Sequence, residues 1–248
     1  MPTILAVDTS ATPVSCAILR DDRLLASYYA HTRSTHSQTL MPMIEHALKM
    51  NNMTMNDIDA LAVNSCPGSF TGVRIGVSAV KGLAFADNKP CIEVSTLESM
   101  AEGFRGLPLD AVLCCVMDAR CNQVYSAVFS CDRSGDITRL SEDEAITLDE
   151  LKERLNGIEK RIIFVGDGAE ICYNAFKDAR ANVSQAPLPL RYQSATGVAS
   201  TAMRKLQMGN TLQTRNCCPD ICVCRRPNVN CAAVWGRNER LGLCALYT

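Results

Sequence analysis

The hydrophobic and polar residues of the first hundred positions follow two different periods. Short apolar runs rich in β-branched side chains, separated by turn residues, predict strands at residues 4–10, 14–20, 23–31, 59–65 and 89–97. Between the third and fourth runs, Leu40, Ile44 and Ala47 repeat at helical spacing. A helix is therefore expected at 37–50, with Ser37 as its N-cap.

From residue 107 the same order of elements starts again. The pattern predicts three strands, a helix, a strand and a helix, at residues 111–119, 123–131, 136–140, 148–156, 161–168 and 169–177. A last helix, at 195–210, is expected to cross back and pack on the first half. Two halves that begin alike predict a duplicated α/β fold with a cleft between two lobes, residues 1–106 with the crossing helix and residues 107–194.

Composition narrows the classes of function. The 248 residues are 47% hydrophobic and 21% charged with a formal net charge of −1, which is typical of a globular protein and gives no basic excess for binding nucleic acid unaided. No apolar run reaches the length of a membrane span, and the N-terminus does not read as a signal peptide, so a cytoplasmic protein is expected. Among the 14 cysteines, Cys114 and Cys115 lie in an apolar run and are predicted to pack in the core.

The segment CPGSFTGVRIGVSAVKGLAF, residues 66–85, joins a glycine turn to a helix with small residues on successive turns. It lacks the Lys-Ser or Lys-Thr end of a P-loop and the serine spacing of a nucleophile elbow. The turn either faces an anion or is capped by Ser69 or Thr71, and the cap is favoured. Glycines inside a helix cost stability, so the helix either packs tightly on its own sheet or forms an exposed docking surface with helix 37–50.

Two aspartates mark the cleft of the predicted fold. Asp8 ends the first strand of the first half, in VDTS, and Asp118 holds the matching place in the second half, in VMDAR. Each can orient a metal-bound phosphate or serve as a turn aspartate that accepts backbone N–H bonds. The turn VGDGA, residues 165–169, would lie beside a nucleotide in such a cleft.

Several segments together resemble the TsaB (YeaZ) family over residues 3–210: ILAVDTS, HSQTLMPMI, NSCPGSFTGVRIGVSAVKGLAF, VSTLESMAE, MDARCNQVYSAVF and VGDGA. The resemblance implies an actin-like, Hsp70-like (ASKHA) fold with mixed five-stranded sheets flanked by helices. It also implies a non-catalytic subunit that pairs with TsaD to make threonylcarbamoyladenosine beside the anticodon of tRNAs that read ANN codons. The ATPase TsaE is expected to dock on this pair, tRNA to bind only through the complex, and a second copy to pair when TsaD is absent.

The resemblance assigns site residues as well. The residues expected to bind TsaD or a second copy are Leu40, Ile44, Ala47, Gly72, Arg74, Gly76, Val77 and Val80. On this basis Gly76→Glu would block pairing without unfolding the chain. The residues expected to remain from a nucleotide cleft are Asp8, Thr9, Asp118, Gly166 and Gly168.

TsaD-like proteins carry a His-x-x-x-His metal pair in a segment resembling VHHxEGH. Thr96 and Met100 stand at those two positions here, so neither a metal nor a cofactor is expected. The three histidines, His31, His36 and His46, also lack the spacing of zinc ligands. Two enzyme alternatives stay open, a nucleotide-binding actin-like ATPase or kinase and an M22-type peptidase homologue, and the missing histidine pair argues against the second.

The end of the chain departs from the family. Residues 216–248 replace the expected PxYLR and QAERE segments with a cysteine-rich sequence. Codons allowed for Cys218 to Val234 can spell the expected ending in another reading frame. We therefore predict a frameshift near Asn216 and a disordered tail.

Overall fold

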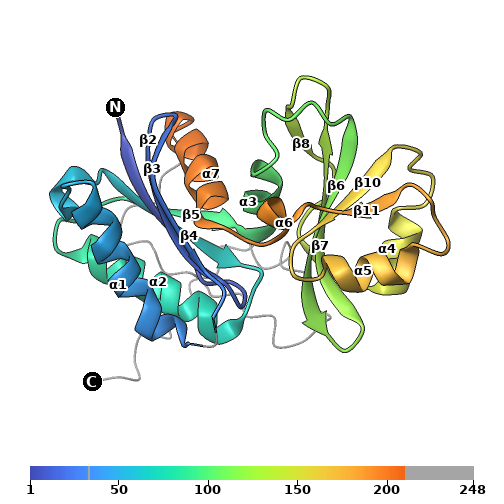
Figure 1. Cartoon of the computed structure of the whole chain (residues 1–248), viewed down its shortest axis with the longest axis horizontal. Coiled ribbons are helices and arrows are strands. Elements are labelled where there is room, and N and C mark those ends of the chain that lie inside the picture. Colours follow the sequence, from blue (N-terminus) through green and yellow to red (C-terminus); the bar gives the residue numbers. More distant parts are fainter. Residues whose placement is uncertain (33, 210–248) are drawn as a thin grey trace, which may run out of the picture.

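The fold is taken from a computed structural model, which describes residues 1–32 and 34–209. Two β-sheets stand side by side, and α3, α6 and α7 lie between and beside them (Figure 1). The first sheet has the order β3-β2-β1-β4-β5. Its strands are β1 Thr3–Asp8, β2 Val14–Arg20, β3 Arg23–Ala30, β4 Ala60–Cys66 and β5 Cys91–Ser95.

The second sheet repeats this arrangement in the order β8-β7-β6-β10-β11. Its strands are β6 Ala111–Arg120, β7 Gln123–Cys131, β8 Ile137–Arg139, β10 Arg161–Val165 and β11 Val183–Gln185, with β9 Glu144–Thr147 paired to β7. β1 is antiparallel to β2 and parallel to β4, and β6 is likewise antiparallel to β7 and parallel to β10. The duplicated, two-lobed actin-like fold is thus confirmed, although β9 makes the second sheet six-stranded rather than five-stranded.

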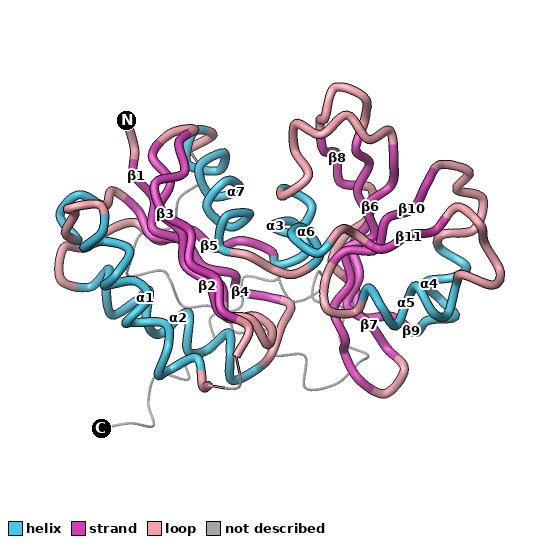
Figure 2. The backbone as a smooth tube through the Cα atoms, viewed as in Figure 1, coloured by secondary structure: helices cyan, strands magenta, loops and turns pink. Residues whose placement is uncertain are grey.

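The helices cover both faces of each sheet. Their bounds are α1 His36–Met50, α2 Phe70–Phe85, α3 Thr96–Glu102, α4 Leu148–Arg154, α5 Ala169–Phe176, α6 Leu188–Arg191 and α7 Ala195–Gln207, with a 3-10 turn at Met55–Asp57. In the tube view, α1 and α2 run side by side along one face of the first sheet, and α7 lies on the other (Figure 2). Helix α7 packs on the first sheet, where the crossing helix was expected. The N-cap position of α1 is Thr35, two residues before the predicted Ser37.

Alternate residues of the central strands enter different cores. Leu5 and Val7 of β1 pack with α1 and α2, whereas Ile4 and Ala6 pack with α7. Neighbouring residues of a strand point to opposite faces, so one strand serves two cores. In the second sheet Cys114 faces the core with α4 and α5, and Cys115 faces the core with α3, as predicted for buried thiols.

One predicted strand ends early because the chain turns into a helix. Residues 89–97 were expected to be extended, but β5 stops at Ser95 and α3 begins at Thr96. The Ser95 hydroxyl accepts a hydrogen bond from the Glu98 backbone N–H at 3.1 Å, as an N-cap does. The sequence Ser-x-x-Glu is the signal for this start.

Helices α3 and α7 join the two sheets. Leu97 and Met100 of α3 pack in a core of the second sheet, while α7 packs on the first sheet. The helices cross closely at Gly197, where a Cβ atom would lie 2.1 Å from the Ser99 carbonyl oxygen. The predicted lobe boundary after residue 106 falls in the connection between α3 and β6, and the predicted disordered tail, residues 216–248, lies outside the described residues.

Candidate functional site

The glycine-rich helix α2 packs against the end of β1, and this contact explains two of its glycines. A Cβ atom on Gly72 would lie 2.1 Å from the Thr9 carbonyl oxygen, and one on Gly76 would lie 2.4 Å from Thr9 Oγ1. The Thr9 hydroxyl donates a hydrogen bond to the Gly72 carbonyl at 2.8 Å. Ser69 caps the helix as predicted, because its Oγ accepts from the Gly72 N–H at 3.4 Å.

This packing sets the burial of the predicted partner-binding residues. Of the eight, only Arg74 is exposed, and the other seven are buried in the first lobe: Leu40, Ile44, Ala47, Gly72, Gly76, Val77 and Val80. Their apolar periodicity marks the face that packs on the sheet, and of the seven only Leu40 also lines the groove between α1 and α2. Gly76→Glu is therefore expected to unfold the lobe, and it is not a clean test of pairing.

The outward face of α2 carries a different set of side chains. Thr71, Arg74, Ser78, Gly82 and Phe85 are exposed at helical spacing, and Phe85 is 83% exposed. A Cβ atom on Gly82 would meet nothing within 4 Å, so internal packing does not require glycine there. The small residues leave the backbone of α2 open to close approach from outside.

Between α1 and α2 this face is hollowed into a groove. The groove has a volume of 460 Å³, and Leu40, Met41, Phe70, Arg74, Ile75 and Ala79 are among its lining residues. We call it the α1–α2 groove. Its lining is apolar apart from hydroxyl groups and Arg74, which is the chemistry of a surface that receives another helix.

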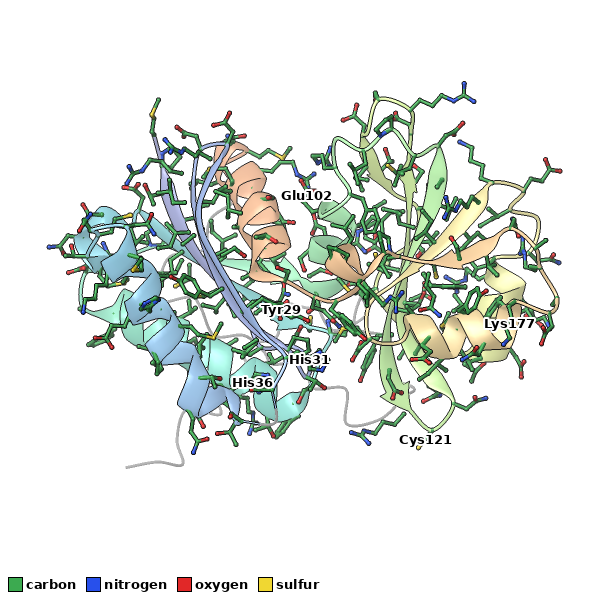
Figure 3. The ribbon with its side chains drawn as sticks, viewed as in Figure 1. Tyr29, His31, His36, Glu102, Cys121 and Lys177 are labelled. Carbon is green, nitrogen blue, oxygen red and sulfur yellow. The ribbon has the colours of Figure 1, made fainter. Side chains whose placement is uncertain are left out.

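A second hollow lies between the lobes, where the ends of β1 and β4 face the β6–β7 turn. This interlobe cleft has a volume of 760 Å³, and polar side chains from both lobes line it, Ser10, His36, Ser69, Asp118, Arg120 and Asp167 among them. His36 lies at the cleft and Cys121 at the tip of the β6–β7 turn (Figure 3). The His36 Nε2 atom is 2.9 Å from the Ala11 carbonyl oxygen.

The two predicted cleft aspartates are both turn aspartates. Asp8 Oδ1 accepts hydrogen bonds from the Ser10 N–H at 2.9 Å and from the Ser10 hydroxyl at 2.7 Å. Asp118 Oδ1 accepts from the Arg120 N–H at 2.7 Å. Asp118 lines the cleft, whereas Asp8 is buried and its Oδ2 has no hydrogen-bond partner among the described residues.

Burial dominates the acid chemistry of Asp8. Removal from water raises the pKa of its carboxyl group, and the hydrogen bonds from Ser10 together with the neighbouring Asn64 offset part of that rise. A carboxyl whose pKa is raised by folding binds its proton more tightly in the folded chain. Its contribution to stability is therefore greatest at low pH and is lost as the pH rises through the folded pKa.

We expect Asp8→Asn to remove this pH dependence. The amide keeps an oxygen that can accept from Ser10 but does not ionise, so the free energy of unfolding should fall less than in the wild type as the pH rises from about 4, the pKa of an unfolded aspartate. Urea unfolding of both proteins from pH 4 to pH 8 measures the difference. Parallel curves would show that folding does not raise the pKa of Asp8. Asp118→Asn, at an exposed position, serves as the control.

The glycine turns use their N–H groups inside the protein. The Gly168 N–H donates to the Val116 carbonyl at 3.2 Å, and the Gly166 N–H donates to Arg191 at 2.6 Å. Gly166 has φ +110°, and a Cβ atom there would lie 2.0 Å from the Val116 carbonyl oxygen. Near α2, the Ser69 N–H donates to the Ser10 carbonyl at 2.7 Å. These amides are not free to cradle a phosphate, so the geometry gives little support to a nucleotide site.

Two buried core residues stand at the positions of the metal-binding histidine pair of TsaD-like proteins. Thr96 and Met100 are both buried on α3, and Met100 Sδ packs against Gly166. A hydroxyl and a thioether do not match the imidazole pair of that motif. Within residues 1–32 and 34–209, no three His, Cys, Asp or Glu side chains gather as metal ligands. The residues present therefore do not fit the metal.

One cleft carboxylate, Asp167, and the buried Gln193 that holds it are not among the residues predicted from the sequence. Asp167 lies between Gly166 and Gly168. Burial raises the pKa of its carboxyl group, and the Gln193 amide lowers it by donating a hydrogen bond at 3.0 Å. The position of Asp167 in the glycine turn was a signal that could have found it. Gln193 precedes the crossing helix and carries no local signal, because its contact spans 26 residues.

Comparison with known proteins gives the family. The family model described as "TsaD: tRNA N6-adenosine threonylcarbamoyltransferase" matches residues 30–232. A Bacillus subtilis (strain 168) relative, "tRNA threonylcarbamoyladenosine biosynthesis protein TsaB", is 32% identical over 71% of this chain and 76% of its own length. The Escherichia coli (strain K12) protein of the same name is 38% identical over 66% of this chain and 71% of its own length. The chain belongs to the TsaB family.

A solved member of the TsaB (YeaZ) family has the same fold. The structure described as "YeaZ from Pseudomonas aeruginosa" aligns with a TM-score of 0.74 at 25% identity and covers 87% of this chain and 97% of its own. The family is therefore supported by sequence and by architecture. Among the described residues, no helix is both long and apolar enough to cross a membrane.

Proposed function

We propose that this TsaB-family chain acts in tRNA threonylcarbamoyladenosine biosynthesis as a non-catalytic subunit that pairs with a TsaD-like catalytic subunit. The names of the relatives support the pathway. Pairing is supported by the α1–α2 groove, which is an apolar surface on the outside of the first lobe. A non-catalytic role is supported by Thr96 and Met100, which stand at the positions of the metal-binding histidines. Such a chain contributes a binding surface and not the reacting metal.

The exposed face of α2 supports pairing by helix packing. Ser78, Ala79 and Gly82 allow the backbone of a partner helix to come close. Phe85 at the end of α2 and Met41 on α1 supply exposed apolar area. Met41 is 43% exposed and can adapt to the shape of the surface it meets. This surface keeps Leu40 and Arg74 of the residues assigned from the sequence and adds exposed residues of α1 and α2.

The remaining partners follow from the same proposal. A TsaE-like ATPase docks on the TsaB–TsaD pair, tRNA is held by the complex, and a second copy occupies the groove when TsaD is absent. The net charge of −1 agrees with indirect contact to tRNA. We place the whole assembly in the cytoplasm.

The test is tRNA threonylcarbamoylation in a reconstituted mixture. TsaD, TsaE, ATP, tRNA and the enzyme that forms threonylcarbamoyl-adenylate are combined with and without this chain, and the modified nucleoside is measured by mass spectrometry of digested tRNA. Strict dependence on the chain is the expected result. The Bacillus subtilis TsaB serves as the positive control, and no dependence beside an active control would overturn the proposal.

The two enzyme alternatives have a separate readout in the isolated chain. Saturable ATP binding or hydrolysis without TsaD would favour the ATPase, and hydrolysis of a peptide substrate would favour the peptidase. We expect neither, because the turn amides donate to protein oxygens and Thr96 and Met100 do not form a metal-binding pair.

A further inference from the structure

Arg74 is the charged side chain of the α1–α2 groove. Its guanidinium lies 3.9 Å from the centroid of the Phe70 ring, so the group is stacked in place before any partner arrives. It is exposed, and no carboxylate among residues 1–32 and 34–209 lies within ion-pair distance of it. A pre-oriented cation at the rim of an apolar groove is a recognition group that the lobe itself does not use.

Covering this groove has an electrostatic consequence. A partner helix removes water from Arg74, and an arginine that loses water without gaining an acceptor opposes binding. Stacking leaves the guanidinium edge free to donate two parallel hydrogen bonds, and a carboxylate matches that edge. A partner that fits the groove therefore places an aspartate or glutamate opposite Arg74.

Charge separates such a partner from a second copy of the chain. Arg74 and Lys81 lie on α2, which has no carboxylate, while α1 carries Glu45 and Lys49. A symmetric pair uses the same surface twice, so it brings the cations of both copies to one interface. Like charges at an interface oppose association, whereas a partner with acidic residues relieves the same repulsion.

We propose that Arg74 is a selectivity-determining residue, which pairs with a carboxylate on a helix of the TsaD-like partner and disfavours self-pairing through the same groove. The proposal rests on the proposed function, because it names the group that distinguishes the catalytic partner from a second copy. It adds one requirement to that function. The partner helix bears an acidic side chain within an apolar surface.

The experiment compares Arg74→Gln, Arg74→Lys and Arg74→Glu in two binding assays. Calorimetric titration with TsaD gives the Kd of the heterodimer at several salt concentrations, and sedimentation equilibrium gives the Kd of self-association. Lys177→Gln is the control for net charge, because Lys177 lies on the far side of the second lobe (Figure 3). Thermal unfolding checks that each variant folds, and Arg74 is exposed, so no change is expected there.

We expect Arg74→Gln to weaken TsaD binding about tenfold and to reduce its salt dependence, while self-association becomes stronger. The Kd of Arg74→Lys for TsaD should lie between those of the wild type and Arg74→Gln, because an ammonium group keeps the charge but lacks the planar edge. Arg74→Glu should weaken TsaD binding most. An unchanged Kd for TsaD in Arg74→Gln would overturn the inference about Arg74 but not the proposed function. So would self-association that weakens in Arg74→Gln, because that result shows Arg74 paired with a carboxylate such as Glu45 of a second copy. Failure of the wild-type chain to bind TsaD would instead overturn the proposed function.

Discussion

Replacement of Gly72 by alanine is expected to destabilise the chain by about 2–4 kcal/mol. The new Cβ atom would lie 2.1 Å from the Thr9 carbonyl oxygen, a backbone atom at the end of β1. A flexible side chain could swing aside, but the carbonyl moves only if α2 or the first sheet moves. The same shift would disturb the hydrogen bond from the Thr9 hydroxyl to Gly72. Urea unfolding followed by circular dichroism measures the loss.

Gly82→Ala is the matched control on the same helix. A Cβ atom at Gly82 has open space around it, so the substitution keeps only the gain in helix propensity, about 0.5–1 kcal/mol. We expect Gly72→Ala to lower the free energy of unfolding and Gly82→Ala to raise it. Equal and small effects at both positions would contradict the tight contact between α2 and β1.

The two faces of α2 show where sequence reasoning stops. The order of strands and helices, their duplication and the helix itself followed from local patterns, because strand and helix periods are properties of short segments. Which face of α2 is buried did not follow, since small and apolar residues occur all around the helix. The contact that fixes the buried face joins Thr9 to Gly72, which are 63 residues apart.

The candidate site shows the same limit for a different reason. Asp8 and Asp118 were found because they hold matching places in the two halves. The sequence left two roles open for each, and the hydrogen bonds that they accept from the residue two positions later favour the turn aspartate. The exposed Arg74 was identified, but its stacking on Phe70 became visible only with the fold. The repeated order of elements predicted where the two aspartates lie in the chain. The exposure and orientation of the side chains depend on how the chain packs.

Ser78→Trp is expected to weaken TsaD pairing at least about a hundredfold, which is roughly 2.7 kcal/mol, without unfolding the chain. Ser78 is exposed on α2 and lines the α1–α2 groove beside Ala79. An indole there fills the space that a partner helix needs, so the two backbones cannot approach. Because Ser78 points outward, the free energy of unfolding should change by less than about 0.5 kcal/mol. The Kd for TsaD and tRNA threonylcarbamoylation are measured on the same preparation.

Ala175→Trp is the control, because it places the same bulk on an exposed helical position of α5 in the second lobe. We expect this variant to bind TsaD and to support tRNA modification like the wild type. If both variants lose pairing, the indole acts through solubility or the partner covers α5 as well. If Ser78→Trp keeps the wild-type Kd, the α1–α2 groove is not the pairing surface, and the inference about Arg74 falls with it. If only Ser78→Trp loses TsaD binding, pairing is assigned to the outward face of α2. Gly82 lies on that face, and internal packing does not require a glycine there.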